Sequence, residues 1–152
     1  IVDPYALKYY PKEIKDKIIL TDPVKAVKAE IKRLKRKADI FVLMTHQGAD
    51  LDYVIAEKIK GLDVIIGAHS QSALEKPEVV NGALIAQAGK EGHYIGVIEL
   101  QIKKGKVISQ FGKIDTMKLE MPDDPVIMEM IEEYERRSGR INHRKLDMKE
   151  NH

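Results

Sequence analysis

Residues 40–71 constrain the fold of this 152-residue chain more than any other segment. Two apolar runs, 40–44 and 62–66, are separated by a short amphipathic stretch. A strand, a helix and a strand in this order form a crossover, which places two parallel strands side by side in one sheet. His46 and His69 each follow one of these runs. Both imidazoles are therefore expected at the same carboxyl edge, where open α/β sheets bind their ligands.

Two helices are predicted outside this crossover unit. Asp22-Pro23 and Asp124-Pro125 each combine a capping carboxylate with proline at the first helical position. The apolar positions after residue 23 recur at helical spacing, while the rest of the segment 24–37 is mostly lysine and arginine. We interpret this basic face as a solvated surface rather than as a site for a polyanion.

The remaining apolar segments read as strands. The runs 40–44 and 62–66 lack alternation, which predicts central parallel strands buried on both faces. Asn81-Gly82 often forms a tight hairpin turn, and Lys103-Lys104-Gly105-Lys106 is expected to turn the chain between two strand-like segments. A short strand is also expected at residues 18–20. The predicted fold class is α/β, with parallel strands leading into an antiparallel meander and helices outside.

The overall charge does not indicate a nucleic acid or a membrane as a partner. Lys and Arg number 26 against 24 Asp and Glu, which gives a net charge of +2. The sequence contains no cysteine, which excludes disulfides and zinc–thiolate sites. No apolar run reaches the roughly 18–20 residues that cross a bilayer. Because the first residue is Ile1, we expect the chain to begin inside a longer protein.

His46, His69 and Gln71 are the candidate metal ligands. Each of them alone is read more simply as a structural or turn residue. Two histidines at adjacent strand ends, with a carboxamide two residues after the second, point together to a metal site. Amide oxygen is an acceptable ligand for Mn, Mg or Zn. Three neutral ligands cannot balance the positive charge of two divalent ions. No nearby acidic residue is placed to bridge the two ions, since Asp50 and Asp52 are read as helix-start residues.

Three motifs together resemble consecutive blocks of the 5′-nucleotidase family, which belongs to the calcineurin-like metallophosphoesterases. They are Thr45-His46-Gln47-Gly48, Gly67-Ala68-His69-Ser70-Gln71 and residues 81–89. The resemblance runs from about residue 21 to residue 134. It implies a fold that is the second half of a two-sheet metallophosphoesterase sandwich, and hydrolysis of phosphomonoesters such as nucleotides. It also implies a periplasmic or extracellular location.

The same resemblance implies two divalent metal ions, Mn, Zn or Mg. His46 and His69 would hold one ion, and Gln71 would hold the other. The family's Asp-x-His, Gly-Asp and Gly-Asn-His-Glu blocks, which supply the bridging aspartate and the transition-state histidine, do not occur here. No catalytic residue is therefore expected in this chain. An amino-terminal half-domain is the expected partner, and the isolated chain is expected to be inactive.

The predicted organisation is an irregular lead-in at 1–20, a half-domain at 21–135 and a polar tail at 136–152. An alternative to a hydrolase is a non-catalytic fragment or binding subunit that pairs with a partner half-domain, or that uses the basic face of 24–37. Because half a sandwich leaves apolar sheet surface uncovered, a homodimer is a further expectation.

The other polar candidates are assigned no chemistry. His93 is read as a structural or surface residue, and His143 and His152 are given no role. Three polar or flexible residues near the third strand group are expected to build the end of the sheet rather than to contact substrate: Asn81, Gln87 and Gly89.

Overall fold

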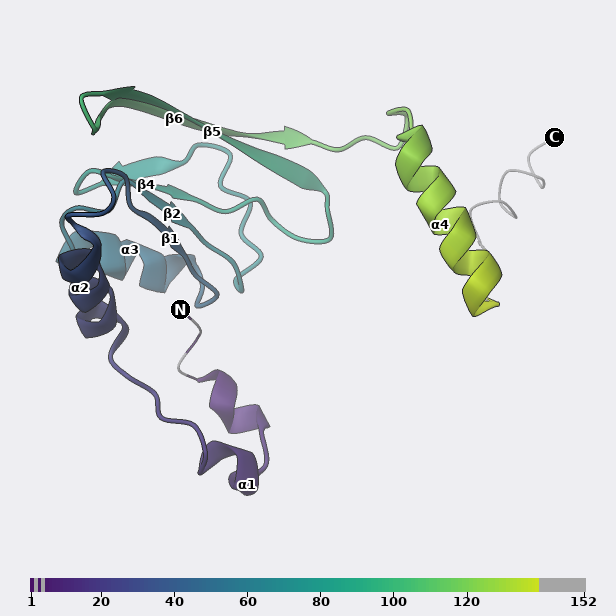
Figure 1. The fold of residues 1–152 in the computed structure, drawn as a ribbon. Helices are drawn as coiled ribbons and strands as arrows, with labels where there is room; N and C mark the ends of the chain where they lie inside the picture. The colour runs from purple at the N-terminus through teal and green to yellow at the C-terminus, as the bar shows by residue number, and fades with distance from the viewer. Residues whose placement is uncertain (2, 4, 140–152) are drawn as a thin grey trace. The chain divides into compact units, whose positions relative to one another are not determined.

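The computed structural model describes residues 1, 3 and 5–139 (Figure 1). The chain divides into two compact units, Ile1–Met117 and Lys118–His152. The first unit begins with two short helices, η1 (Ala6–Tyr9) and α1 (Lys12–Lys15). The predicted domain limits, 21–135 for the half-domain, stay a prediction.

The strand expected at residues 18–20 is wrong. These residues form no regular element, and Ile19 is 90% exposed. An apolar triplet becomes a strand only where a neighbouring strand accepts its backbone hydrogen bonds, and residues 18–20 have no such neighbour among the described residues.

A four-stranded mixed sheet forms the centre of the first unit. Its order is β1-β2-β4-β3, with β1 parallel to β2, β2 parallel to β4, and β3 antiparallel to β4. The strands are β1 (Val42–Met44), β2 (Val64–Ile66), β3 (Glu78–Val80) and β4 (Ala83–Ala86). The parallel pairing of β1 with β2 confirms the crossover predicted from residues 40–71. The β3–β4 hairpin joins this same sheet, because β4 pairs with β2.

Two helices cover one face of this sheet, α2 (Pro23–Leu34) and α3 (Ala49–Lys58) (Figure 1). The carboxylate of Asp22 accepts from the Lys25 amide at 2.9 Å, which confirms the predicted cap of α2. The core lies between helices and sheet and is built from these buried side chains: Val27, Ile55, Ala56, Ile59, Leu62, Ile65, Ala83 and Ile85. This packing fixes α3 against the strands whose ends carry the two histidines.

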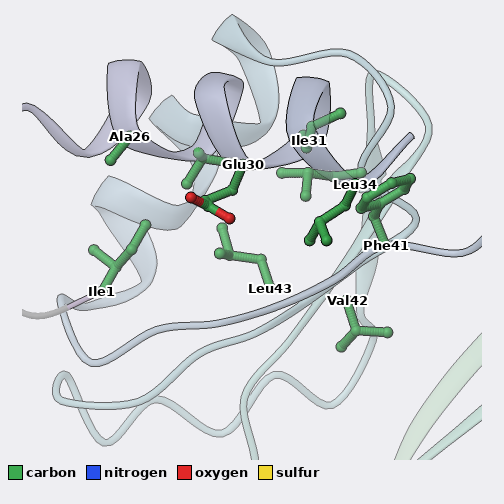
Figure 2. Close-up of a pocket in the computed structure, with 10 residues that line it drawn as sticks. Ile1, Ala26, Glu30, Ile31, Leu34, Phe41, Val42 and Leu43 are labelled. Atoms are coloured by element: carbon green, nitrogen blue, oxygen red, sulfur yellow. The ribbon is translucent and has the colours of Figure 1, made fainter. Parts of the chain in front are cut away.

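The expectation that β1 is buried on both faces is wrong. β1 is the edge strand of its sheet, and Val42 and Met44 are 52% and 72% exposed. Only Leu43 packs against the helical side, and Figure 2 shows Val42 on the opposite side of the strand. Strand β2 is closer to the expectation, since Val64 and Ile65 are buried and only Ile66 is exposed. An apolar run predicts a strand, but it does not say which faces other elements cover.

A hairpin forms a second sheet on the other face. Strands β5 (Tyr94–Lys103) and β6 (Lys106–Thr116) pair antiparallel and form a two-stranded sheet of their own. Their turn, Lys104-Gly105, has φ angles of 50° and 72°, and Asn81-Gly82 in the β3–β4 turn has φ angles of 51° and 94°. Both predicted turns are confirmed. The predicted meander is thus divided between two sheets.

A cavity of about 230 Å³ lies between α2 and β1 (Figure 2). Ala26, Ile31 and Leu34 line it from the helix, and Phe41 and Leu43 line it from the strand side. Glu30 is the one ionisable side chain among the described residues that line it. A cavity with this lining lacks the converging polar groups of a catalytic site.

The second unit contains α4 (Pro125–Ser138). The carboxylate of Asp124 accepts from the amides of Val126 and Ile127, which confirms the predicted helix start. The helix continues past residue 136, where the polar tail was expected, and ends at Gly139 with φ 66°. Residues 140–152, with His143 and His152, lie outside the described residues. Among the described helices, none combines the length and the hydropathy that crossing a bilayer requires.

Candidate metal centre

The imidazoles of His46 and His69 lie together at the carboxyl edge of the parallel strands. Their ring centroids are 5.1 Å apart, and the ring planes are inclined by 67°. His46 follows β1 and His69 follows β2, as the crossover predicted. Two imidazoles that share one ion at about 2.0–2.1 Å per bond have centroids roughly 5 Å apart. The spacing of the pair therefore fits a shared divalent ion.

Backbone hydrogen bonds connect two loops: the first follows β1 and carries His46, and the second follows β2 and carries His69. The Thr45 amide donates to Ile66 O at 3.0 Å, and the Gly48 amide donates to Ala68 O at 3.0 Å. On the outer side of the first loop, the His46 amide donates to Ile1 O at 2.7 Å. His46 is consequently held from both sides, by the second loop and by the first residue of the chain.

A buried carboxylate lies beneath the first loop. Asp52 of α3 is fully buried, and its Oδ2 accepts from Thr45 Oγ1 at 2.9 Å. Its Oδ1 accepts from Gln47 Nε2, also at 2.9 Å. The sequence identified Asp52 only as a helix-start residue. Asp52 precedes Ile55 by three residues and Ile59 by seven, and this helical spacing places it on the same face as those buried side chains. The spacing was therefore the pattern in the sequence that could have predicted its burial.

A second polar network lies beneath the His69 loop. Ser70 Oγ accepts from the Ala49 amide at 3.1 Å and donates to Gln87 Oε1 at 3.0 Å. Gln87 is 4% exposed. The structure thus joins the ends of β2 and β4 to the first residue of α3. Gln87 supports the end of the sheet, in line with the reading from the sequence.

The backbone at both candidate ligands of this loop is strained. His69 has φ 84° and Gln71 has φ 58°, a region that side-chain-bearing residues rarely occupy. Such conformations cost of order 1–3 kcal/mol each and concentrate at functional sites. Gln71 is exposed, and within the described residues no hydrogen bond or ring contact joins it to either imidazole. The assignment of His46, His69 and Gln71 as metal ligands stays a prediction.

The acidic residues of this part of the fold do not complete a metal site. Asp3 Oδ2 lies 3.4 Å from His69 Nε2, while Asp3 Oδ1 accepts from the Tyr5 amide. Asp63 Oδ2 accepts from the Phe41 amide at 2.8 Å, which is a structural role. No group of three or more His, Asp or Glu side chains in the described part of the chain is arranged to hold an ion. Among the described residues, the imidazole pair thus has no third side chain of this kind placed to share an ion with it.

The other candidates show no contact with either imidazole among the described residues. His93 is exposed and lies 3.9 Å from Glu91 Oε2, which agrees with a surface role. Lysines from α2 and the end of α3 line a shallow hollow: Lys28, Lys32, Lys35, Lys58 and Lys60. Lys58 ends α3, whereas the histidine loops adjoin its first residue. The reading of the basic face as solvated surface stays a prediction.

Burial raises the pKa of the Asp52 carboxyl, while the hydrogen bonds from Gln47 and Thr45 and the positive amino terminus act in the opposite direction. The folded state therefore holds this proton more tightly than the unfolded state does. We expect the free energy of unfolding to fall as the pH rises from about 4 through the raised pKa. Urea titrations of the wild type and of Asp52→Asn over this window measure the effect.

In Asp52→Asn this component of the pH dependence is expected to vanish, because the amide does not titrate. The matched control is Asp50→Asn, since Asp50 is an exposed acid in the same first turn of α3. If the Asp52→Asn and Asp50→Asn variants follow the wild-type slope alike, the buried carboxyl is not responsible for it.

Comparison with known proteins relates the chain to one family. No family model matches it. Over 96 residues it is 41% identical to the uncharacterized metallophosphoesterase YunD of Bacillus subtilis, a match that covers 62% of this chain and 20% of YunD. It is 27% identical over 130 residues to the 5′-nucleotidase of Homo sapiens, covering 72% of this chain and 23% of that protein. These matches relate the chain to proteins that are named metallophosphoesterase and 5′-nucleotidase.

The fold agrees with this family. The 5′-nucleotidase precursor of Thermus thermophilus superposes with a TM-score of 0.67 at 24% identity, covering 78% of this chain and 27% of that one. This likeness supports the mixed α/β architecture, in which a parallel-strand sheet is accompanied by an antiparallel one. The chain spans only 20–27% of the length of these three proteins.

Proposed function

We propose that this chain contributes the imidazole pair of a dinuclear metal centre to a phosphomonoester hydrolase of the 5′-nucleotidase type. The observation that carries the proposal is the pair itself. His46 and His69 lie 5.1 Å apart at the carboxyl edge of a parallel sheet, on loops anchored by buried polar networks. Relatives named metallophosphoesterase and 5′-nucleotidase support the reaction class, and nucleotides are the proposed substrates.

Each imidazole would hold the shared ion through one ring nitrogen, and the Gln71 amide oxygen would hold a second ion. When bound, divalent ions of this kind polarise phosphoryl oxygens and stabilise the charge that develops on them. Mn, Zn and Mg are the proposed ions. The chain's own task is to keep two imidazoles fixed at one spacing, which the hydrogen bonds at Thr45, Gln47 and Ser70 achieve.

The carboxylates that such a centre needs would come from a partner. Three neutral ligands leave the charge of two divalent ions unbalanced, so we propose an amino-terminal half-domain that supplies acidic ligands and the catalytic residues. The side chains of Val42, Met44 and Ile66 leave an apolar surface on β1 and β2 that such a half-domain, or a second copy of this chain, would cover. By relation to the family, we propose a periplasmic or extracellular location.

The test compares this chain alone with the polypeptide encoded by the complete reading frame that contains it. We expect the complete polypeptide to hydrolyse AMP with Mn²⁺, to lose this activity with EDTA and to regain it when Mn²⁺ is restored. The isolated chain is expected to show no turnover. Absence of Mn²⁺ or Zn²⁺ binding by the complete polypeptide in isothermal titration calorimetry would favour the alternative, a non-catalytic binding subunit.

A further inference from the structure

We propose that the buried carboxylate of Asp52 is a positioning residue, which sets the His46 imidazole beside His69 by binding the residues on both sides of His46. The inference rests on the proposed function, because the value of the positioning lies in the metal centre. It concerns the geometry of the two loops, however, and this geometry can be measured without a metal.

The side chains of His46 and of its two neighbours differ in their exposure to solvent. Thr45 and Gln47 are 6% and 5% exposed, whereas His46 between them is exposed. In an extended segment, residues i−1 and i+1 point to one side and residue i points to the other. Because each oxygen of Asp52 accepts from one of these neighbours at 2.9 Å, both are held inward and His46 is directed outward.

Asp52 also occupies space beside the segment that leads to His69. A Cβ atom at Gly67 would overlap Asp52 Oδ2. Gly67 has no positive φ, so its backbone does not itself require glycine. The carboxylate accounts for the glycine at this position. Asp52 therefore touches the loop of His46 through Thr45 and Gln47, and the start of the His69 segment through Gly67.

Asp52 is an acidic residue on the buried face of α3, which it shares with Ile55 and Ala56. Burying a charged group costs free energy unless hydrogen bonds compensate for the lost water. The network also leaves Gln47 Oε1 buried without a partner in the described part of the chain. A buried charge of this kind is weak evidence for a gain in stability, so we assign this one a geometric role. In this fold, the geometry that it controls is the separation of the two histidine loops.

The experiment measures the imidazole pair directly. In the 152-residue chain, the nuclear Overhauser effect between the ring protons of His46 and His69 reports their contact. We expect it to disappear in Asp52→Ala and to persist in Asp50→Ala, which removes an exposed carboxylate from the same helical turn. Asp52→Asn should retain it, because an amide can accept from Gln47 and donate to the Thr45 hydroxyl.

The second readout is the affinity for Mn²⁺ in the complete polypeptide. Removing a residue that holds metal ligands in place typically weakens metal binding about 10–100-fold. We expect this decrease in affinity for Asp52→Ala and not for Asp50→Ala. Persistence of the Overhauser effect and of wild-type Mn²⁺ affinity in folded Asp52→Ala would overturn the proposal.

Two milder variants keep the test decisive if Asp52→Ala does not fold. Thr45→Val and Gln47→Met each remove one donor to the carboxylate, and an unchanged imidazole contact in both overturns the proposal. Failure of the proposed function gives a different result. In that case the wild type binds no Mn²⁺, while the Overhauser effect still depends on Asp52.

Discussion

Replacing either His46 or His69 by alanine is expected to weaken Mn²⁺ binding by the complete polypeptide by more than about 100-fold. Replacing a residue that only supports a metal ligand already weakens binding about 10–100-fold. Hydrolysis of AMP is expected to fall with it. The reason is that both imidazoles lie close enough to share one ion. Calorimetric titration with Mn²⁺ and initial rates with AMP measure the two effects.

The control for this prediction is His93→Ala. His93 is also a histidine of the first unit, but its exposed side chain lies beside Glu91 and not in the ring contact that joins His46 to His69. We expect its replacement to leave both affinity and rate unchanged. Equal losses in all three variants would mean that the effect is not specific to the carboxyl edge of the sheet.

Replacing Gly67 by alanine is expected to destabilise the fold by about 1–3 kcal/mol, the usual cost of an added methyl group in a packed interior. The new methyl group would overlap Asp52 Oδ2, and this oxygen is buried and held by Thr45 Oγ1. The carboxylate therefore cannot turn away without breaking a hydrogen bond. Urea denaturation followed by circular dichroism gives the change in unfolding free energy.

Gly96→Ala is the matched control, because its added methyl group would make only ordinary contact, 3.4 Å from the Ala88 side chain. We expect it to be close to neutral. The double variant Gly67→Ala with Asp52→Ala should cost less than the sum of the single variants, because removing the carboxylate vacates the space that the methyl group needs. Strict additivity would show that the two residues do not interact.

Local signals in the sequence predicted most elements of the fold. The starts of α2 and α4 follow from the capping carboxylates Asp22 and Asp124, whose hydrogen bonds to nearby amides the structure contains. The tight turns at Asn81-Gly82 and Lys104-Gly105 follow from the residue types that accept positive φ. These predictions succeed because the interactions that determine them involve residues within a few positions of one another.

The faces of the strands could not be predicted in this way. The apolar run at 40–44 read as doubly buried, yet Val42 and Met44 are exposed on β1. Whether a strand face is covered depends on where distant segments fold. The β5–β6 hairpin lies much later in the chain, and it packs beside β4, which leaves Val42 and Met44 of β1 exposed.

The sequence by itself determined the crossover, and with it the meeting of His46 and His69, because the handedness of parallel strand connections leaves few alternatives. Only the tertiary structure decided how that pair is held. The burial of Asp52, its bonds to both neighbours of His46 and the space it occupies beside Gly67 join segments that are distant in sequence. Such contacts depend on how α3 packs against two strand ends, and no short-range pattern specifies this packing.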